Sequence, residues 1–352
     1  MNFTSDNSAP ASPEILDALI AANKGPQAAY GEDDYTRAAT AALRAVFETN
    51  CEVAFVATGT AANSLALAQV TPSWGGIFCH PQAHINTNEC AAPEAFCHGA
   101  KIITVPGDFA KMTGDGLTAS LARYPRGPIH TVQPAAMSLS QATESGTIYS
   151  VDEIATLADM AHAAGMKVHM DGARFANAIA ALNVSPAEMT WRAGVDVLCL
   201  GATKGGALAC EAVIFFDPAL ARDFGFRRKQ SGHVVSKGRW FGAQMTAWLQ
   251  DELWLRLARH ANAQSRLLAD GLAGIPGVRI PWPVQTNEVF AILPQKLDAA
   301  LRAAGASYYF WPTQGLVPAQ APVNGEVFVR MITSFATTEA EIAQFLQVCR
   351  AI

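Results

Sequence analysis

Short apolar runs alternate with amphipathic stretches along most of this chain, which predicts strands that alternate with helices. Helical patterns cover residues 14–23, 35–48 and 151–164, and another begins near Ala61. The strand candidates between them are residues 53–56, 76–79, 102–105, 129–132, 168–170, 195–200 and 213–216. Such alternation is typical of βαβ units, so we expect an α/β fold with a mostly parallel seven-stranded central sheet. Ligands bind such sheets at the carboxyl ends of the strands.

The pattern changes after one long amphipathic segment, residues 251–272, which is followed by Gly274 and Pro276. Short strands and two helical patterns, 295–304 and 339–350, come after it. This remainder is too short for a second doubly wound sheet. We therefore predict a large domain over residues 1–250, which includes the N-terminal segment, and a small α+β domain over residues 251–352.

Composition narrows the classes of protein that fit. Half of the 352 residues are apolar and 16% are charged, which excludes a disordered chain. The formal charge of −5 argues against a nucleic-acid partner. Residues 1–13 lack the features of a targeting signal, and no apolar run reaches the ~18 residues of a membrane span. Seven scattered cysteines without a C-x-x-C pair favour buried thiols over disulfides or zinc, so we expect a cytoplasmic protein without a metal site.

A candidate anion site follows the first predicted strand. Thr58, Gly59 and Thr60 lie where that strand ends and a helix begins. Gly59 allows the backbone to approach an anion, and the free N–H groups of the helix start and the threonine hydroxyls form a cup for phosphate. The same threonines also suit an ordinary helix cap, so this motif alone leaves both interpretations open.

Asp171 and Lys204 follow two later strands. An aspartate there can hold a heteroaromatic nitrogen in its protonated form, or it can cap the next helix. Lys204 lies between Gly201 and Gly205 in a small apolar loop, where a desolvated amine suits Schiff-base formation; on a solvated loop it would have no such role. Together, the cup, the aspartate and the lysine match the phosphate, ring nitrogen and aldehyde of pyridoxal 5′-phosphate.

These motifs make the chain similar to the L-threonine aldolase family of the β-eliminating-lyase superfamily. The other matching segments are Tyr30-Gly31-Glu32-Asp33, His84 with Glu89, and Phe328-Val329-Arg330. Asp171-Gly172-Ala173-Arg174 and Lys204-Gly205 are the most specific. The resemblance implies a pyridoxal-phosphate enzyme of fold type I that cleaves L-β-hydroxy-α-amino acids, such as L-threonine, L-allo-threonine and phenylserine, to glycine and an aldehyde. It also implies a homotetramer, a dimer of dimers that share active sites.

The resemblance also implies roles for individual residues. Lys204 would form the internal aldimine, Asp171 would pair with the pyridine nitrogen, and His84 would stack on the cofactor ring. The phosphate would be held by Thr58, Gly59 and Thr60, and the substrate's α-carboxylate by Ser5, Arg174 and Arg330. Fixing that carboxylate sets the Cα–Cβ bond perpendicular to the cofactor ring, so that cleavage leaves a quinonoid glycine carbanion. The basic segments 227–230 and 237–239 are candidates for reaching a neighbouring subunit's site.

One segment departs from the family. Where the family often has Thr-His-Asn, residues 138–147 contain no histidine, and Gln141 takes that place near the substrate hydroxyl. A glutamine can hydrogen-bond a hydroxyl but cannot take its proton, so the base is left to His84, His130, a bound water or an unidentified group. A β-eliminating lyase or an aminotransferase on the same fold, or a non-catalytic cofactor-binding protein, is the alternative interpretation. Release of ammonia and a 2-oxo acid would distinguish the first two from an aldolase.

Overall fold

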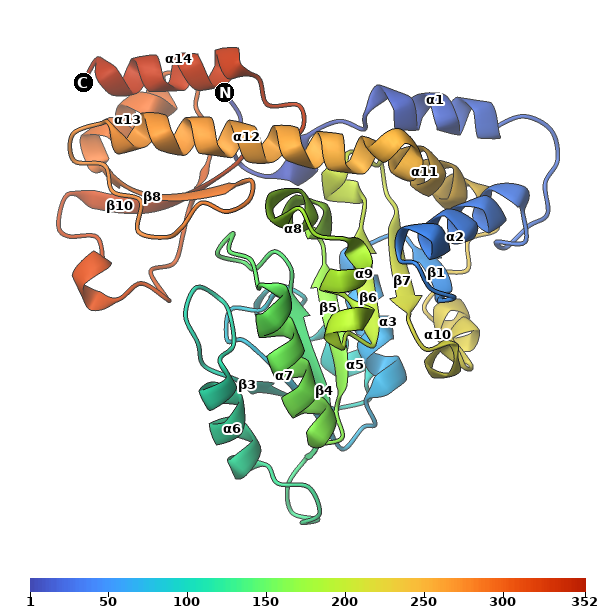
Figure 1. Cartoon of the computed structure of the whole chain (residues 1–352). Coiled ribbons are helices and arrows are strands. Elements are labelled where there is room, and N and C mark those ends of the chain that lie inside the picture. Colours follow the sequence, from blue (N-terminus) through green and yellow to red (C-terminus); the bar gives the residue numbers. More distant parts are fainter.

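A computed structural model describes all 352 residues, and seven strands form its central sheet (Figure 1). The strand order is β1-β7-β6-β5-β4-β2-β3, and only β7 runs antiparallel to its neighbours. This arrangement confirms the predicted mostly parallel α/β sheet. The strands are β1 (Glu52–Val56), β2 (Gly75–Cys79), β3 (Lys101–Thr104), β4 (Gln133–Ser140), β5 (Lys167–Gly172), β6 (Val197–Gly201) and β7 (Glu211–Phe215).

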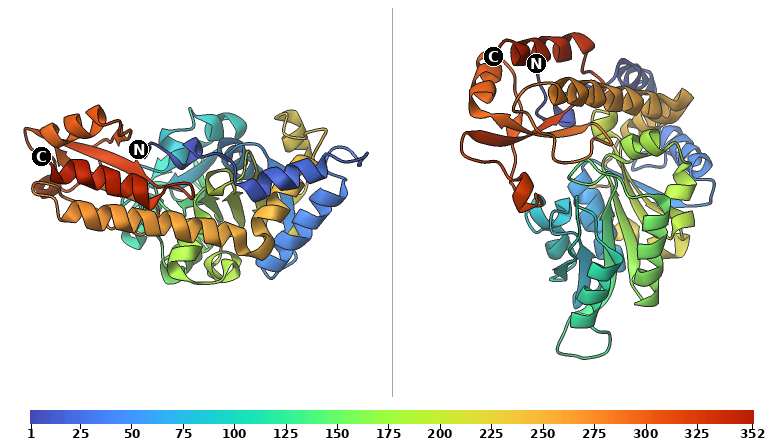
Figure 2. Two further views of the ribbon diagram at one scale, coloured as in Figure 1. Left: turned by 90° about the horizontal axis from the view of Figure 1, so that it is seen from above. Right: turned by 60° about the vertical axis from the view of Figure 1, so that its left-hand side comes forward.

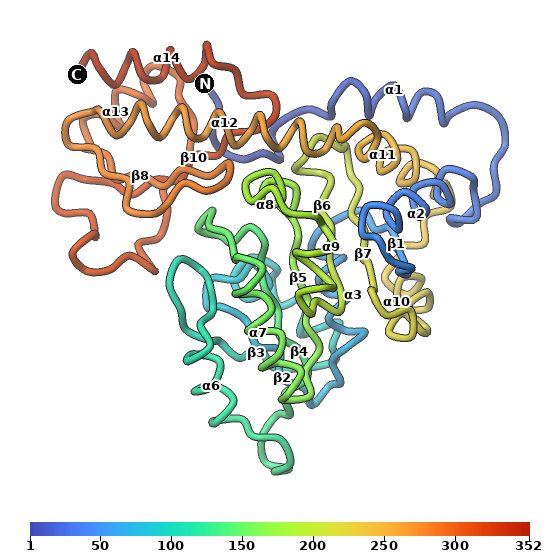
Figure 3. Tube along the Cα trace, in the orientation of Figure 1, coloured from blue at the N-terminus to red at the C-terminus, as the bar shows by residue number.

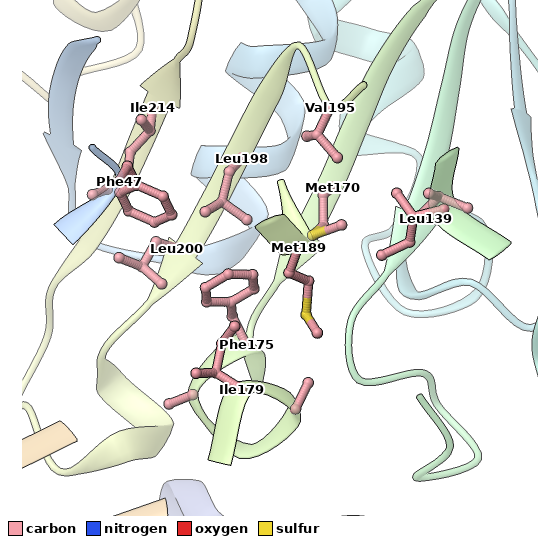
Figure 4. Close-up of a cluster of buried hydrophobic side chains, with 14 of the residues drawn as sticks. Phe47, Leu139, Met170, Phe175, Ile179, Met189, Val195, Leu198, Leu200 and Ile214 are labelled. Atoms are coloured by element: carbon pink, nitrogen blue, oxygen red, sulfur yellow. The ribbon is translucent and has the colours of Figure 1, made fainter. Parts of the chain in front are cut away.

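Helices cover both faces of this sheet because its strands are apolar on both sides. In β6, Leu198 and Leu200 face one core while Val197 and Cys199 face the other. Figure 4 shows the first of these cores, where Phe175 and neighbouring side chains pack against the sheet. Its helices are α2 (Asp34–Val46), α6 (Gly114–Arg123), α7 (Val151–Ala163), α8 (Phe175–Leu182), α9 (Pro186–Met189) and α11 (Arg239–Leu249). The opposite face carries α3 (Gly59–Val70), α4 (His84–Thr87), α5 (Ala92–Phe96) and α10 (Phe224–Gln230).

A second, smaller sheet lies beside the large one (Figure 2). It is antiparallel, with β10 (Glu326–Ile332) between β8 (Glu288–Pro294) and β9 (Tyr309–Phe310). The helices α13 (Gln295–Ala303) and α14 (Glu339–Arg350) belong to the same part of the chain. The long helix α12 (Leu253–Ala273) connects the two parts: Trp254 belongs to the first core and Leu268 to the second. The domain division near residue 250 stays a prediction.

The N-terminal segment packs on the C-terminal part of the molecule, and the chain then continues into α1 (Pro13–Ala22). Phe3 is fully buried in the second core, with its ring centroid 5.3 Å from that of Phe345 in α14. Asn2 pairs with Ser307 in a parallel bridge. Figure 3 shows this terminus beside α14. The sequence analysis includes the N-terminal segment in the large domain, whereas the side chain of Phe3 packs in the core of the C-terminal part.

The predicted strand at 129–132 is wrong. Ile129 is 91% exposed in a turn, and β4 begins only at Gln133. The prediction rested on the apolar residues Ile129 and Val132. The first residues of β4 include Pro134 and two alanines, which have low strand propensity. Pro134 is tolerated because pairing with β5 starts only at Ala136. None of the helices has the length and apolar character needed to cross a membrane.

Candidate active site

Segments that are distant in sequence meet around one cavity at the carboxyl ends of β4, β5 and β6. The inner part of this cavity has a volume of about 310 Å³. An outer part of about 420 Å³ adjoins it and shares His84, Glu144, Arg174 and Lys204 with it. The inner part is lined by Thr58, Gly59, Thr60 and Asp171, and the outer part by Ser5 and Arg330. The structure therefore brings together all but two of the predicted site residues.

The start of α3 lies at the wall of the inner cavity, where the sequence predicts the anion cup. Thr58 is the N-cap residue, and its hydroxyl accepts a hydrogen bond of 3.2 Å from the Ala61 N–H. The first N–H groups of a helix have no partner within it, and here they lie at the cavity wall. No atom lies within 4 Å of the place where a Cβ would stand on Gly59. Thr58 thus caps the helix and also lines the cavity, so its position is compatible with both a capping role and an anion-binding role.

Asp171, near the end of β5, presents a buried carboxylate to the inner cavity. It accepts hydrogen bonds of 3.0 Å from the Ala173 N–H and 2.9 Å from the Asn63 side chain. Burial opposes its ionisation, but the charges of His84 and Lys204 outweigh burial and lower the pKa of Asp171 below its ordinary value. It caps no helix, because α8 begins only at Phe175. The site therefore contains an ionised acceptor.

His84, at the start of α4, is anchored by a buried glutamate. Its Nδ1 lies 2.7 Å from the Glu89 carboxylate, which also accepts a 2.9 Å hydrogen bond from Asn63. The hydrogen bond that His84 donates to Glu89 is the main cause that raises the pKa of His84, and burial raises the pKa of Glu89. Because Nδ1 is occupied, only Nε2 of the imidazole is available to a ligand.

Lys204 lies in a tightly packed turn, the 3-10 helix Thr203–Gly205, directly after β6. The Gly205 carbonyl accepts a hydrogen bond of 2.9 Å from the indole N–H of Trp248. Gly206 ends the turn with a φ of +109°, a conformation that favours glycine. Thr203 donates to the buried Glu211 at 2.5 Å. The loop is therefore held in place on both sides of Lys204, unlike the solvated glycine loop of the alternative interpretation.

The three residues expected to hold a carboxylate are not equivalent. Arg174 already makes a two-point contact with the buried Asp6, at 2.7 and 3.1 Å, and lies 3.6 Å from Glu288. The Arg330 guanidinium lies 4.1 Å from the ring centroid of Trp311, and its Nε is buried without a partner. Ser5 lines the outer cavity and accepts a hydrogen bond from Asn7. Arg330 therefore has more donors left for a ligand than Arg174.

Two predicted substrate contacts are wrong. Gln141 is fully buried and lines neither part of the cavity, because its amide bonds the backbone of Tyr149, accepting at 3.0 Å and donating at 2.9 Å. His130 is exposed in the turn before β4, at the end of the sheet opposite to the cavity. Figure 1 shows this turn at the bottom and α8, which follows β5, at the upper end of the central sheet, below α12.

Sequence reasoning missed several buried polar residues at the site. Asn63 in α3 bridges Glu89 and Asp171, a role that the sequence analysis does not give it. Four carboxylates whose positions the sequence pattern did not single out surround the cavity: Asp6, Glu144, Glu211 and Glu288. The available signal was a charged residue at the edge of an apolar strand, as in Glu211 at the start of β7 and Glu288 at the start of β8.

Known proteins resemble this chain in sequence and in fold. Residues 2–296 match the model of the beta-eliminating lyase family. The chain is 44% identical to a low specificity L-threonine aldolase of Pseudomonas aeruginosa, over 89% of this chain and 90% of that protein. It is 39% identical to the enzyme of that name from a Pseudomonas species, over 99% and 97%. The solved threonine aldolase of Leishmania major superimposes with a TM-score of 0.91 at 28% identity, over 99% and 98% of the two chains. The chain therefore belongs to the beta-eliminating lyase family, within its threonine aldolase branch.

Proposed function

We propose that this protein binds pyridoxal 5′-phosphate and cleaves L-β-hydroxy-α-amino acids to glycine and an aldehyde, with L-threonine, L-allo-threonine and phenylserine as the substrate class. The observation that carries the proposal is the convergence of Lys204, Asp171 and the start of α3 on one cavity. This set of donors fits the cofactor, because it offers an amine for the aldehyde, an ionised carboxylate for the protonated ring nitrogen, and free N–H groups for the phosphate. The names of the two Pseudomonas relatives support the reaction.

The bound cofactor supplies a sink for the electron pair of the bond that breaks at Cα. In the proposal, Thr58, Gly59 and Thr60 hold its phosphate. Asp171 holds the ring nitrogen in its protonated form, because a low pKa keeps the carboxylate ionised. Lys204 supplies the amine that bonds the aldehyde carbon. His84 lies against the ring and keeps its orientation through Glu89.

The substrate's carboxylate is bound at the outer cavity by Arg330 and Ser5. Arg330 is supported by this geometry because its guanidinium rests on Trp311 and retains an unpartnered Nε. Arg174, which is paired with Asp6, adds positive charge behind this site and orients the carboxylate rather than binding it alone. A carboxylate fixed in plane and direction selects which bond at Cα is broken.

The same proposal includes a homo-oligomer, a dimer of dimers with shared active sites. Support comes from large apolar side chains left exposed: Ile20 at 68%, Tyr30 at 55% and Phe226 at 71%. Residues 227–230 and 237–239 would reach the neighbour's site. The molar mass from light scattering during size-exclusion chromatography tests the assembly. The free cysteines support a cytoplasmic location.

Product analysis by mass spectrometry tests the activity. Protein loaded with pyridoxal phosphate is incubated with L-threonine, L-allo-threonine and both phenylserine diastereomers. Glycine with the matching aldehyde is the expected result, and Lys204→Ala should abolish it together with the visible absorbance of the bound cofactor. Ammonia with a 2-oxo acid would instead identify a β-eliminating lyase or an aminotransferase. The absence of any product from all four would contradict the aldolase proposal.

A further inference from the structure

Glu144 is a buried carboxylate at the junction of the inner and outer cavities. It lies in the loop after β4 and lines both parts of the cavity. One oxygen, Oε1, accepts hydrogen bonds of 2.7 Å from the Ser140 hydroxyl and 2.7 Å from the backbone N–H of His84. The other oxygen, Oε2, is buried and has no hydrogen-bond partner. A buried acceptor without a donor is costly, so a ligand donor at this position would compensate for its burial.

The environment of Glu144 suits a group that gains and loses a proton near neutral pH. Burial raises the pKa of Glu144 to about 7, with the charge of Asp171 adding to this effect and the Ser140 hydrogen bond opposing it. A pKa near the working pH is the optimum for general acid–base catalysis. The charged and titratable groups around it, from each neighbouring element, are His84, Asp171, Arg174, Lys204, Cys79 and Tyr149.

The other candidate bases are less suited to act on a substrate hydroxyl. Gln141 cannot take a proton, and it faces Tyr149 rather than the cavity. The hydrogen bond to Glu89 raises the pKa of His84 and so favours the charged imidazole, which has no free lone pair to take a proton. Glu288 lies 3.6 Å from Arg174, at the end of the outer cavity where the α-carboxylate would bind. Glu211 lines only the inner part of the cavity, not the outer part where the substrate would bind, and its Oε1 accepts a hydrogen bond from Thr203.

We propose that Glu144 is the catalytic base that takes the proton from the β-hydroxyl of the substrate. The inference rests on the proposed aldolase function. The O–H bond breaks and its proton moves to Oε2, while the O–H electron pair forms the carbonyl of the departing aldehyde. The Cα–Cβ bond breaks and its electron pair stays on Cα, which the bound cofactor stabilises. Cα then takes one proton from the active site, which balances the proton given up by the hydroxyl.

The primary test compares Glu144→Gln with wild-type protein loaded with pyridoxal phosphate. Glutamine has the same shape but takes no proton, so kcat for L-threonine should fall by roughly 10²–10⁴-fold with little change in KM. The acid limb of the kcat–pH profile near pH 7 should disappear. Glu211→Gln is the matched control, because burial raises the pKa of Glu211 to about 7 as well. If the limb disappears in Glu211→Gln and persists in Glu144→Gln, the proposal is overturned.

A partial reaction separates this inference from the function on which it rests. Glycine has no β-hydroxyl, so exchange of its Cα hydrogens with deuterated water should continue in Glu144→Gln at close to the wild-type rate. An equal loss of exchange and cleavage would show a structural role and contradict the proposal. If wild-type protein exchanges glycine but cleaves no β-hydroxy amino acid, the aldolase function fails instead.

Two further measurements do not require the Glu144→Gln variant to be catalytically active. Carbon-13 NMR of glutamate-labelled, cofactor-free protein should show a carboxyl signal that titrates near pH 7 and is absent from folded Glu144→Gln. Ser140→Ala removes a hydrogen bond that favours the ionised carboxylate, so the acid limb should move upward by about one pH unit. An unmoved limb in Ser140→Ala would contradict the assignment of that limb to Glu144.

Discussion

The buried pair of Asp6 and Arg174 joins the N-terminal segment to the active site, and its removal should strongly destabilise the protein. Asp6 is 3% exposed, and the Arg174 side chain is 11% exposed. Asp6→Asn leaves the guanidinium buried without its paired carboxylate, and the charges of Glu288, 3.6 Å away, and of Glu144 replace it only in part. Breaking a buried pair by removing one partner costs about 3–5 kcal/mol. Since Glu288 compensates in part, we expect about 3 kcal/mol here.

Urea unfolding at pH 7, followed by tryptophan fluorescence at one fixed protein concentration, measures this loss. Glu48→Gln is the control, because it breaks the pair of Glu48 with Arg192, whose side chains are 47% and 43% exposed. Such a surface pair contributes less than about 1 kcal/mol. If Asp6→Asn costs no more than Glu48→Gln, the assignment of the pair as a buried anchor is refuted.

The same pair leads to a prediction about how the free energy of unfolding changes at acid pH. Burial disfavours the charge of Asp6, but Arg174 and Lys204 outweigh burial and hold the pKa of Asp6 below its ordinary value of 3.8. A lowered folded pKa means that the stabilisation is complete above that ordinary value and is lost as pH falls through the folded value. The difference in unfolding free energy between wild type and Asp6→Asn should therefore stay constant from pH 7 to 5 and shrink only below about pH 4.

Three further predictions follow from single contacts. Glu89→Gln removes the hydrogen bond that raises the pKa of His84, so the pKa of His84 should fall, as nitrogen-15 NMR of the cofactor-free protein can measure; an unchanged value would contradict the contact. Phe3→Ala empties a fully buried site in the second core and should cost about 3–5 kcal/mol in the urea assay, and a loss below 1 kcal/mol would contradict this packing. Trp248→Phe removes the hydrogen bond to Gly205 beside Lys204, so titration should show weaker binding of pyridoxal phosphate than in wild type.

The elements that could be predicted from sequence are those whose pattern is local and strong. The helices at 151–164 and 339–350 are observed as Val151–Ala163 and Glu339–Arg350, because each pairs an apolar stripe with a capping box at its start. The strand β4 was not predicted because its residues, which include Pro134 and several small side chains, have little strand propensity. Its residues are buried because of the position of β4 within the sheet.

The candidate site divides in the same way. Thr58 and Lys204 follow β1 and β6 closely, and Asp171 lies near the end of β5. Parallel strands place their carboxyl ends at one edge, so the sequence order alone predicts that these residues meet. Gln141 shows the limit of this reasoning. It follows β4 directly, yet its amide turns inward to satisfy the backbone of Tyr149, a contact that depends on how the following loop folds back.

The sequence by itself determined the α/β sheet, the family and the three proposed attachment points of the cofactor, because these depend on local periodicity and on residue types at strand ends. Only the tertiary structure decided that Asp6 forms an ion pair with Arg174, 168 residues away in sequence, and that one buried oxygen of Glu144 has no hydrogen-bond partner. The physical reason is that burial and pairing depend on which distant segments pack together. A charged residue has the same local pattern whether solvent or a cavity surrounds it.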